Sequence, residues 1–147
     1  MKLALLISML IANCLGQVDF AVTVAGTFTC STPFVYQVDL MENDSPWPDQ
    51  LIHSTKWKNS NGTSGAYFVH GVGSDGMFES EIEPYIKITH SCSKDVYRPG
   101  VAGVYRAKCV CKWFRNVKEH LDETAVNIDL ETASDLTPCR DHRCIDE

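Results

Sequence analysis

Two stretches of alternating side-chain character constrain the fold of this chain more than any other feature. Residues 22–30 alternate β-branched and aromatic positions with threonines and small residues, and residues 104–114 place every second side chain from Tyr105 to Trp113 on one face. A period of two is typical of a β-strand with one buried face. Both stretches therefore predict strands rather than helices.

Further short segments with extended character, separated by polar turns, bring the expected total to about seven strands. They cover residues 35–42, 51–57, 66–70, 85–90 and 125–130. Seven short strands with polar turns predict an all-β sandwich. The positions expected in its core are Val24, Phe28, Val38, Leu40, Tyr67, Ile86, Ile88 and Trp113.

The run of glycines from Gly71 to Gly76 formally matches the G-x-G-x-x-G pattern of dinucleotide-binding loops. Such a site needs a helix directly after the glycines, and Pro84 follows too soon for one. We therefore expect residues 71–76 to form a loop, and we expect no cofactor.

The N-terminus has the organisation of a secretory signal peptide. Lys2 precedes the apolar run of residues 3–12, and small residues precede a cleavage point after Gly16, so the mature domain is expected to cover residues 17–147. A lipoprotein with an acylated Cys14 is less favoured, because Asn13 is a poor residue before the cysteine. The ten-residue run is half of the ~20 residues that a spanning helix needs. We expect no membrane span.

Removal of the leader leaves an even number of cysteines: Cys30, Cys92, Cys109, Cys111, Cys139 and Cys144. In an oxidising compartment six cysteines predict three structural disulfides and no free thiol. Cys109 and Cys111 could instead form a redox pair or bind zinc, but no second close pair of ligands completes a metal site. Because their side chains are parallel in a strand, we expect each to have a different partner.

A secreted chain can also be glycosylated at Asn-x-Ser/Thr sequences. Asn61 and Asn43 both stand in such sequences, and Pro46 after the second disfavours its use.

Charge is segregated along the chain, whose net charge of -6 argues against a general nucleic-acid binder. Residues 87–118 contain one acidic residue and eight basic ones, whereas the flanking segments are acidic. These blocks could simply neutralise one another on the folded surface. Alternatively, they form a basic strand face that binds the phosphate or sulfate groups of anionic lipid headgroups or glycosaminoglycans. The residues of that face are Arg106, Lys108 and Lys112, extended by Arg98 and Arg115.

Five segments of the chain have a composition and spacing that can be compared with known families. They are Gly26-x-x-x-Cys30-x-x-Pro33, Val38-x-Leu40, Pro48-Asp49-Gln50-Leu51, Gly65-x-Tyr67-x-Val69-x-Gly71 and, as the most specific, Ile82-Glu83-Pro84 followed by Ile86, Ile88, His90 and Cys92. Together they resemble the nematode transthyretin-like family of secreted proteins, and the last segment is similar to a signature of that family.

The resemblance implies a transthyretin-like Greek-key sandwich of two sheets with a disulfide-tethered C-terminal tail. It implies that Cys92 pairs with Cys109 or Cys111, and Cys30 with Cys139 or Cys144. It also implies a non-enzymatic extracellular binding or adaptor protein. The expected partner is an extracellular protein or, from the basic strand face described above, an anionic surface.

Two alternatives remain open. One is a small secreted hydrolase similar to 5-hydroxyisourate hydrolase, which shares the transthyretin fold; this chain, however, lacks the C-terminal Tyr-Arg-Gly-Ser of that enzyme. Of the five histidines only His90 lies in the family signature, and a structural role at a strand end is favoured for it. The other alternative is a structural matrix or cuticle component.

Overall fold

A computed structural model describes residues 18–44, 48–75, 81–92 and 107–139. The predicted leader, Arg98, Arg106 and Cys144 lie outside these residues. Within them, all regular secondary structure is β-strand, and the short extra strands explain why more than seven are found. The strands are β1 (Val18–Thr29), β2 (Val35–Glu42), β3 (Gln50–Ser54), β4 (Lys58–Asn59), β5 (Ser64–Asp75), β6 (Pro84–His90), β7 (Lys108–Trp113), β8 (His120–Glu123), β9 (Ile128–Asp129) and β10 (Thr137–Pro138).

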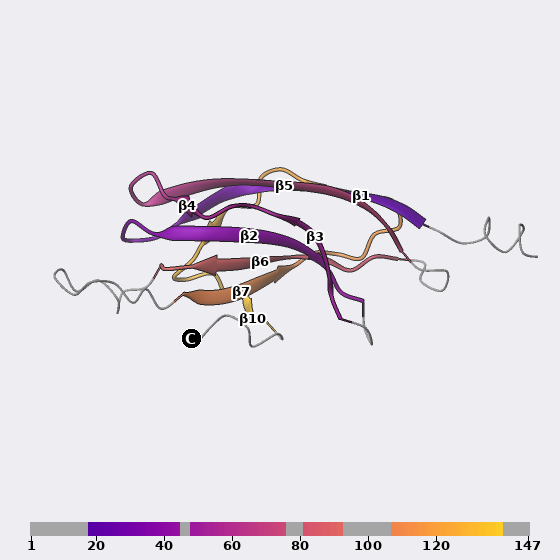
Figure 1. The fold of residues 1–147 in the computed structure, drawn as a ribbon. Helices are drawn as coiled ribbons and strands as arrows, with labels where there is room; N and C mark the ends of the chain where they lie inside the picture. Colours follow the sequence, from indigo (N-terminus) through magenta and orange to yellow (C-terminus); the bar gives the residue numbers. More distant parts are fainter. Residues whose placement is uncertain (1–17, 45–47, 76–80, 93–106, 140–147) are drawn as a thin grey trace, which may run out of the picture.

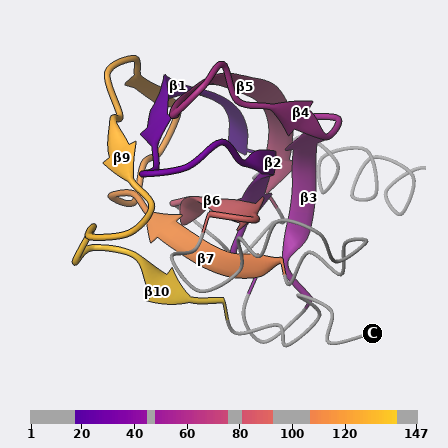
Figure 2. The ribbon, with the colours of Figure 1, turned by 90° about the vertical axis from the view of Figure 1, so that its left-hand side faces the viewer.

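The strands form two sheets that pack face to face (Figure 1). The first sheet has the order β5–β1–β8, with β9 also paired to β1. The second has the order β10–β7–β6–β2–β3, with β4 also paired to β2. The predicted all-β sandwich of two sheets is therefore confirmed. Seen end-on, β3 lies at one side of the sandwich, and β9 lies at the other (Figure 2).

The core lies between the inner faces of the two sheets. Phe28 of β1 stacks on Tyr67 of β5 with ring centroids 4.3 Å apart, and its edge meets Tyr36 of β2. Seven of the eight predicted core residues are buried there, from Val24 to Ile88. The pattern predicts them correctly because in a strand every second side chain faces the opposite sheet.

Residues 71–75 belong to the long strand β5, so the prediction of a loop at Gly71–Gly76 is wrong for these positions. A Cβ on Gly71 would lie 2.1 Å from Cγ2 of Ile52, and one on Gly73 would lie 2.5 Å from Cζ of Phe20. These glycines are needed because core side chains pack directly on the backbone of the strand.

A disulfide joins the two sheets at one end. Cys30 directly follows β1 in the first sheet, Cys92 follows β6 in the second, and their Cα atoms are 5.9 Å apart. The pairings expected for both cysteines from the resemblance are therefore wrong. The physical reason is that β1 and β6 end side by side on opposite sheets, whereas Cys139 lies beside β7.

The second disulfide joins Cys111 of β7 to Cys139, which follows β10. It ties the C-terminal strand to the edge of the second sheet. Cys109 is also disulfide-bonded, so the expectation that Cys109 and Cys111 have different partners is confirmed. The C-terminal tail is tethered as expected, but to β7 rather than to β1.

His90, at the end of β6, is buried beside the disulfide between the sheets. The residue is 1 % exposed, and its Nδ1 accepts a hydrogen bond from the backbone N–H of Cys92 at 3.2 Å. Burial is the main cause that lowers the pKa of His90 from 6.5 to about 4, and the nearby charge of Lys108 adds to it. The structural role favoured for His90 fits this environment.

Protonation of His90 should therefore destabilise the protein in acid. The folded state binds this proton less tightly than the unfolded state. The contribution of neutral His90 to the free energy of unfolding is therefore complete above pH 6.5 and is lost as the pH falls toward 4. The shift corresponds to ~3 kcal/mol of unfolding free energy. Denaturant titrations from pH 7 to 4 should show a shallower loss for His90→Asn than for the wild type. Equal pH slopes would contradict this assignment.

Candidate functional site

The two lysines of the strand β7 lie on the same face of the strand as Val110. Its register on β6 places Lys108 opposite His90, Val110 opposite Ile88 and Lys112 opposite Ile86. Val110 packs against the core, as expected for a position opposite a buried isoleucine. Because side chains alternate, Lys108 and Lys112 point to the same side as Val110.

The other face of β7 lies on the outside of the second sheet. Trp113 stacks on Tyr85 with ring centroids 4.3 Å apart, and its indole N–H donates to Oγ1 of Thr137 at 3.2 Å. The prediction that Trp113 belongs to the core is therefore wrong. The two faces of the strand are composed as predicted, but the aromatic face packs on the outside of the sheet and not between the sheets.

A cleft of about 440 Å³ opens between β7 and the segment that contains β9. In Figure 2, the end of β7 and the strand β9 lie on the side of the sandwich opposite β3. Lys112 and Arg115 line the cleft from the second sheet, and Glu123 and Asn127 line it from the first. Two of the five predicted binding residues are thus brought together in one concave site.

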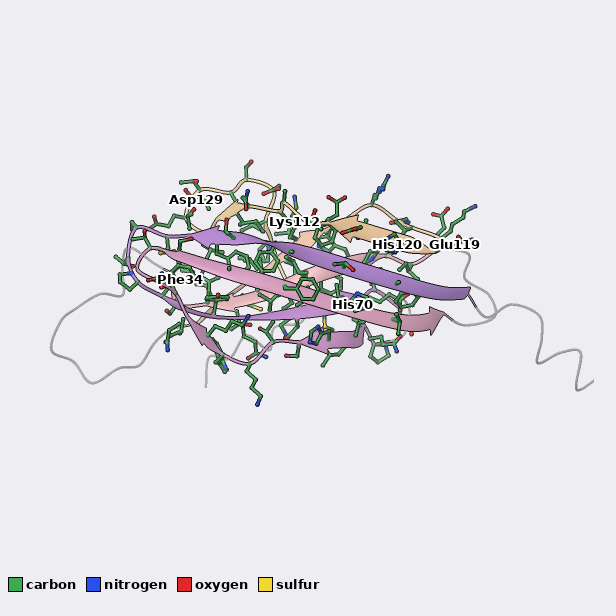
Figure 3. The ribbon with its side chains drawn as sticks, turned by 90° about the horizontal axis from the view of Figure 1, so that it is seen from above. Phe34, His70, Lys112, Glu119, His120 and Asp129 are labelled. Carbon is green, nitrogen blue, oxygen red and sulfur yellow. A yellow bond between two sulfur atoms is a disulfide. The ribbon has the colours of Figure 1, made fainter. Side chains whose placement is uncertain are left out.

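Lys112 makes an ion pair with Asp135 in this cleft. The hydrogen bond from Lys112 is the main cause that lowers the pKa of the Asp135 carboxyl. The lysine is 22 % exposed and the aspartate 55 %. A long lysine stem can cross the apolar margin of the core and bring its ammonium group to the cleft. In Figure 3, Lys112 lies toward the same side as Asp129 and away from His70.

The predicted binding residues do not form one solvent-facing stripe within the described part of the chain. Lys108 is exposed at the start of β7 and Arg115 is exposed just after its end, whereas Lys112 between them is paired. Arg98 and Arg106 lie outside the described residues. The first of the two expectations for the charged blocks was that basic and acidic residues neutralise one another on the surface. The ion pair of Lys112 with Asp135 is one such case.

The two candidate glycosylation sites differ in their surroundings. Asn61 is exposed in the turn that joins β4 to β5. Asn43 is half-buried, and its Nδ2 donates to the carboxylate of Glu83. A glycan is attached at Nδ2, so these contacts favour Asn61 as the acceptor.

Several residues of the cleft were not predicted. Asp135 stands in an acidic segment that the charge pattern does reveal, but nothing in the sequence pairs it with Lys112. Asn127 lines the cleft and its Oδ1 also accepts a hydrogen bond from the hydroxyl of Thr27 at 2.7 Å. Both residues can be recognised as part of the cleft only from the folded structure, because no sequence pattern marks them.

One group of potential metal ligands occurs among the described residues: Cys30, Cys92 and Glu131. Its two sulfur atoms are joined in a disulfide and offer no thiolates. Within the described ranges, no helix is long and apolar enough to cross a membrane.

The model of the transthyretin-like family matches residues 25–115, which include β1 to β7 apart from the first residues of β1. The chain belongs to the transthyretin-like family. A search of curated proteins and a search of solved structures found no match. The family match covers Lys112 and Arg115 on one side of the cleft, whereas Asn127 and Asp135 on the other side follow the matched region.

The ion pair can be tested by titrating Asp135. In the wild type, NMR should give a carboxyl pKa below the ordinary value for aspartate, because Lys112 donates to the charged form. The pKa should rise in Lys112→Gln and stay low in Lys118→Gln, which removes an exposed cation after Val117. A value for Asp135 that is unchanged in Lys112→Gln would show that the ion pair does not form in solution.

Proposed function

We propose that this protein is a secreted, non-enzymatic binding protein that holds the phosphate or sulfate group of an anionic partner in the cleft beside β7. The partner surface is a lipid headgroup or a glycosaminoglycan. The observation that carries the proposal is that Lys112 and Arg115, from the basic segment, line the same cleft. A concave site lined by two cations is suited to an oxyanion, which competes there with the carboxylates of Glu123 and Asp135.

The pairing of Lys112 supports this use. The carboxylate of Asp135 already interacts with the ammonium group of Lys112, so the position is suited to negative charge. The pair is accessible and therefore weak, and a ligand with several negative charges can compete with a single carboxylate. Lys108, exposed at the other end of β7, can contact an extended anionic surface. Arg98 and Arg106 belong to the same proposal.

Secretion is supported by the leader-like N-terminus and by the disulfides among the described residues, which are typical of oxidising compartments. A binding role rather than catalysis is supported by His90, since the histidine of the family signature is buried and bonded to the backbone. A turnover assay with hydroxyisourate tests the alternative of a hydrolase.

The proposal can be tested by measuring binding to heparin and to vesicles of phosphatidylcholine with phosphatidylserine. We expect binding to at least one of them at 0.1 M salt and its loss at 1 M, where the Debye length falls from ~10 to ~3 Å. The double variant Lys112→Gln with Arg115→Gln should weaken binding by about 2 kcal/mol, roughly 30-fold, at ~1 kcal/mol per cation. Asp135→Asn should strengthen it, because it frees Lys112.

The matched control is Lys56→Gln with Lys58→Gln, which removes the same charge from the β3–β4 region on the opposite side of the sandwich. It should leave binding unchanged. An equal loss of binding in both double variants would show that only the net charge of the protein matters, and it would contradict a binding site at the cleft. Absence of binding to both ligands at 0.1 M salt would also overturn the proposal.

A further inference from the structure

Three sulfur atoms gather on the outer face of β7, where the C-terminal strand attaches. Cys111 is bonded to Cys139, and the Sγ of Cys109 lies only 3.5 Å from the Sγ of Cys139. Cys109 is itself disulfide-bonded. The sulfur of Cys139 is therefore in contact with two cysteines of the same strand.

The ladder between β7 and β10 makes both pairings geometrically accessible. Thr137 lies opposite Cys111, and Pro138 lies opposite Val110. One further step along this antiparallel register puts Cys139 opposite Cys109. Directly opposed positions have Cβ atoms about 4.5–5.5 Å apart, close to the span of a disulfide. A change of partner from Cys111 to Cys109 thus needs no change of register.

The surroundings favour thiolate chemistry at this place. Lys87 lies opposite Cys111 and Thr89 lies opposite Cys109, on the same outer face. The hydroxyl of Thr89 is 3.9 Å from the Sγ of Cys109. A lysine at the facing position of the next strand and a hydroxyl donor both favour the thiolate, which is the reacting form of cysteine.

We propose that Cys109, Cys111 and Cys139 form a thiol–disulfide exchange site that responds to low-molecular-weight thiols. A thiolate of that class attacks the disulfide of Cys109 at its partner sulfur, forms a mixed disulfide there and releases Cys109 as a thiolate. Cys109 then attacks the Sγ of Cys139. The bond between Cys111 and Cys139 breaks as the bond between Cys109 and Cys139 forms, and Cys111 leaves as a thiolate that takes a proton from water.

The disulfide between the sheets provides an internal comparison. Both cysteines of that disulfide are buried, with Cys30 5 % and Cys92 1 % exposed. In the three-cysteine site Cys111 is also 1 % exposed, but Cys109 and Cys139, the attacking sulfur and the attacked one, are half-buried. Access controls exchange as strongly as thiolate character does. Mild thiol treatment should therefore rearrange the three-cysteine site and leave the disulfide between the sheets intact.

The test treats the oxidised full chain with reduced glutathione, quenches in acid, unfolds the protein, blocks thiols with N-ethylmaleimide and maps them by fragmentation mass spectrometry. Label should appear on Cys111 at least about tenfold faster in the wild type than in Cys109→Ser, which lacks the attacking sulfur. In Cys111→Ser, Cys139 should be bonded to Cys109.

Equal labelling of Cys111 in the wild type and in Cys109→Ser would overturn the proposal. So would a free thiol at Cys139 in folded Cys111→Ser. If Cys111→Ser fails to fold, the rates of labelling at Cys111 in the wild type and in Cys109→Ser still test the proposal. Lys87→Met adds a check on the proposed environment, since it should slow labelling of Cys111 without changing which residues are labelled.

Discussion

The disulfide between Cys111 and Cys139 joins the outer face of β7 to the C-terminal strand β10. It thereby fixes the face of the sheet to which each of the remaining side chains of β7 points. With Cys111 on the outside, a period of two puts Trp113 on the outside as well, where it stacks on Tyr85. The same period puts Lys112 on the side of the core. At the edge of a sandwich, that side leads into the cleft between the sheets.

The cleft therefore follows from how the two sheets end. The first sheet ends in the short strands β8 and β9, and the second continues past β7 to β10. Short edge strands leave the margin of the core only partly covered, which gives room for the stem of Lys112 and for its ion pair with Asp135. The opposite side of the sandwich is closed differently. There Ile52 of β3 packs on the backbone of Gly71 in β5.

The amino-acid pattern was sufficient to predict the longer strands and most of the core, but it missed the short strands β4, β8 and β10. Val24, Phe28, Val38 and Leu40 alternate with polar or small residues, so their buried face is unambiguous. Residues 108–113 are different, because Val110 on one face and Trp113 on the other are both apolar. The choice of the buried face was then decided by contacts with β10, which no local pattern encodes. The pairing of Cys30 with Cys92 was missed for the same reason, since it depends on which strand ends meet in space.

The orientation of β7 can be measured directly by nuclear Overhauser contacts in isotopically labelled protein. We expect contacts from the indole of Trp113 to the ring of Tyr85 and to Thr137, and contacts from Val110 to the core around Ile88. Contacts from Trp113 to the methyl groups of Ile86 and Ile88 instead would put the aromatic face of β7 between the sheets. That result would turn Lys112 away from the cleft and contradict a binding site beside β7.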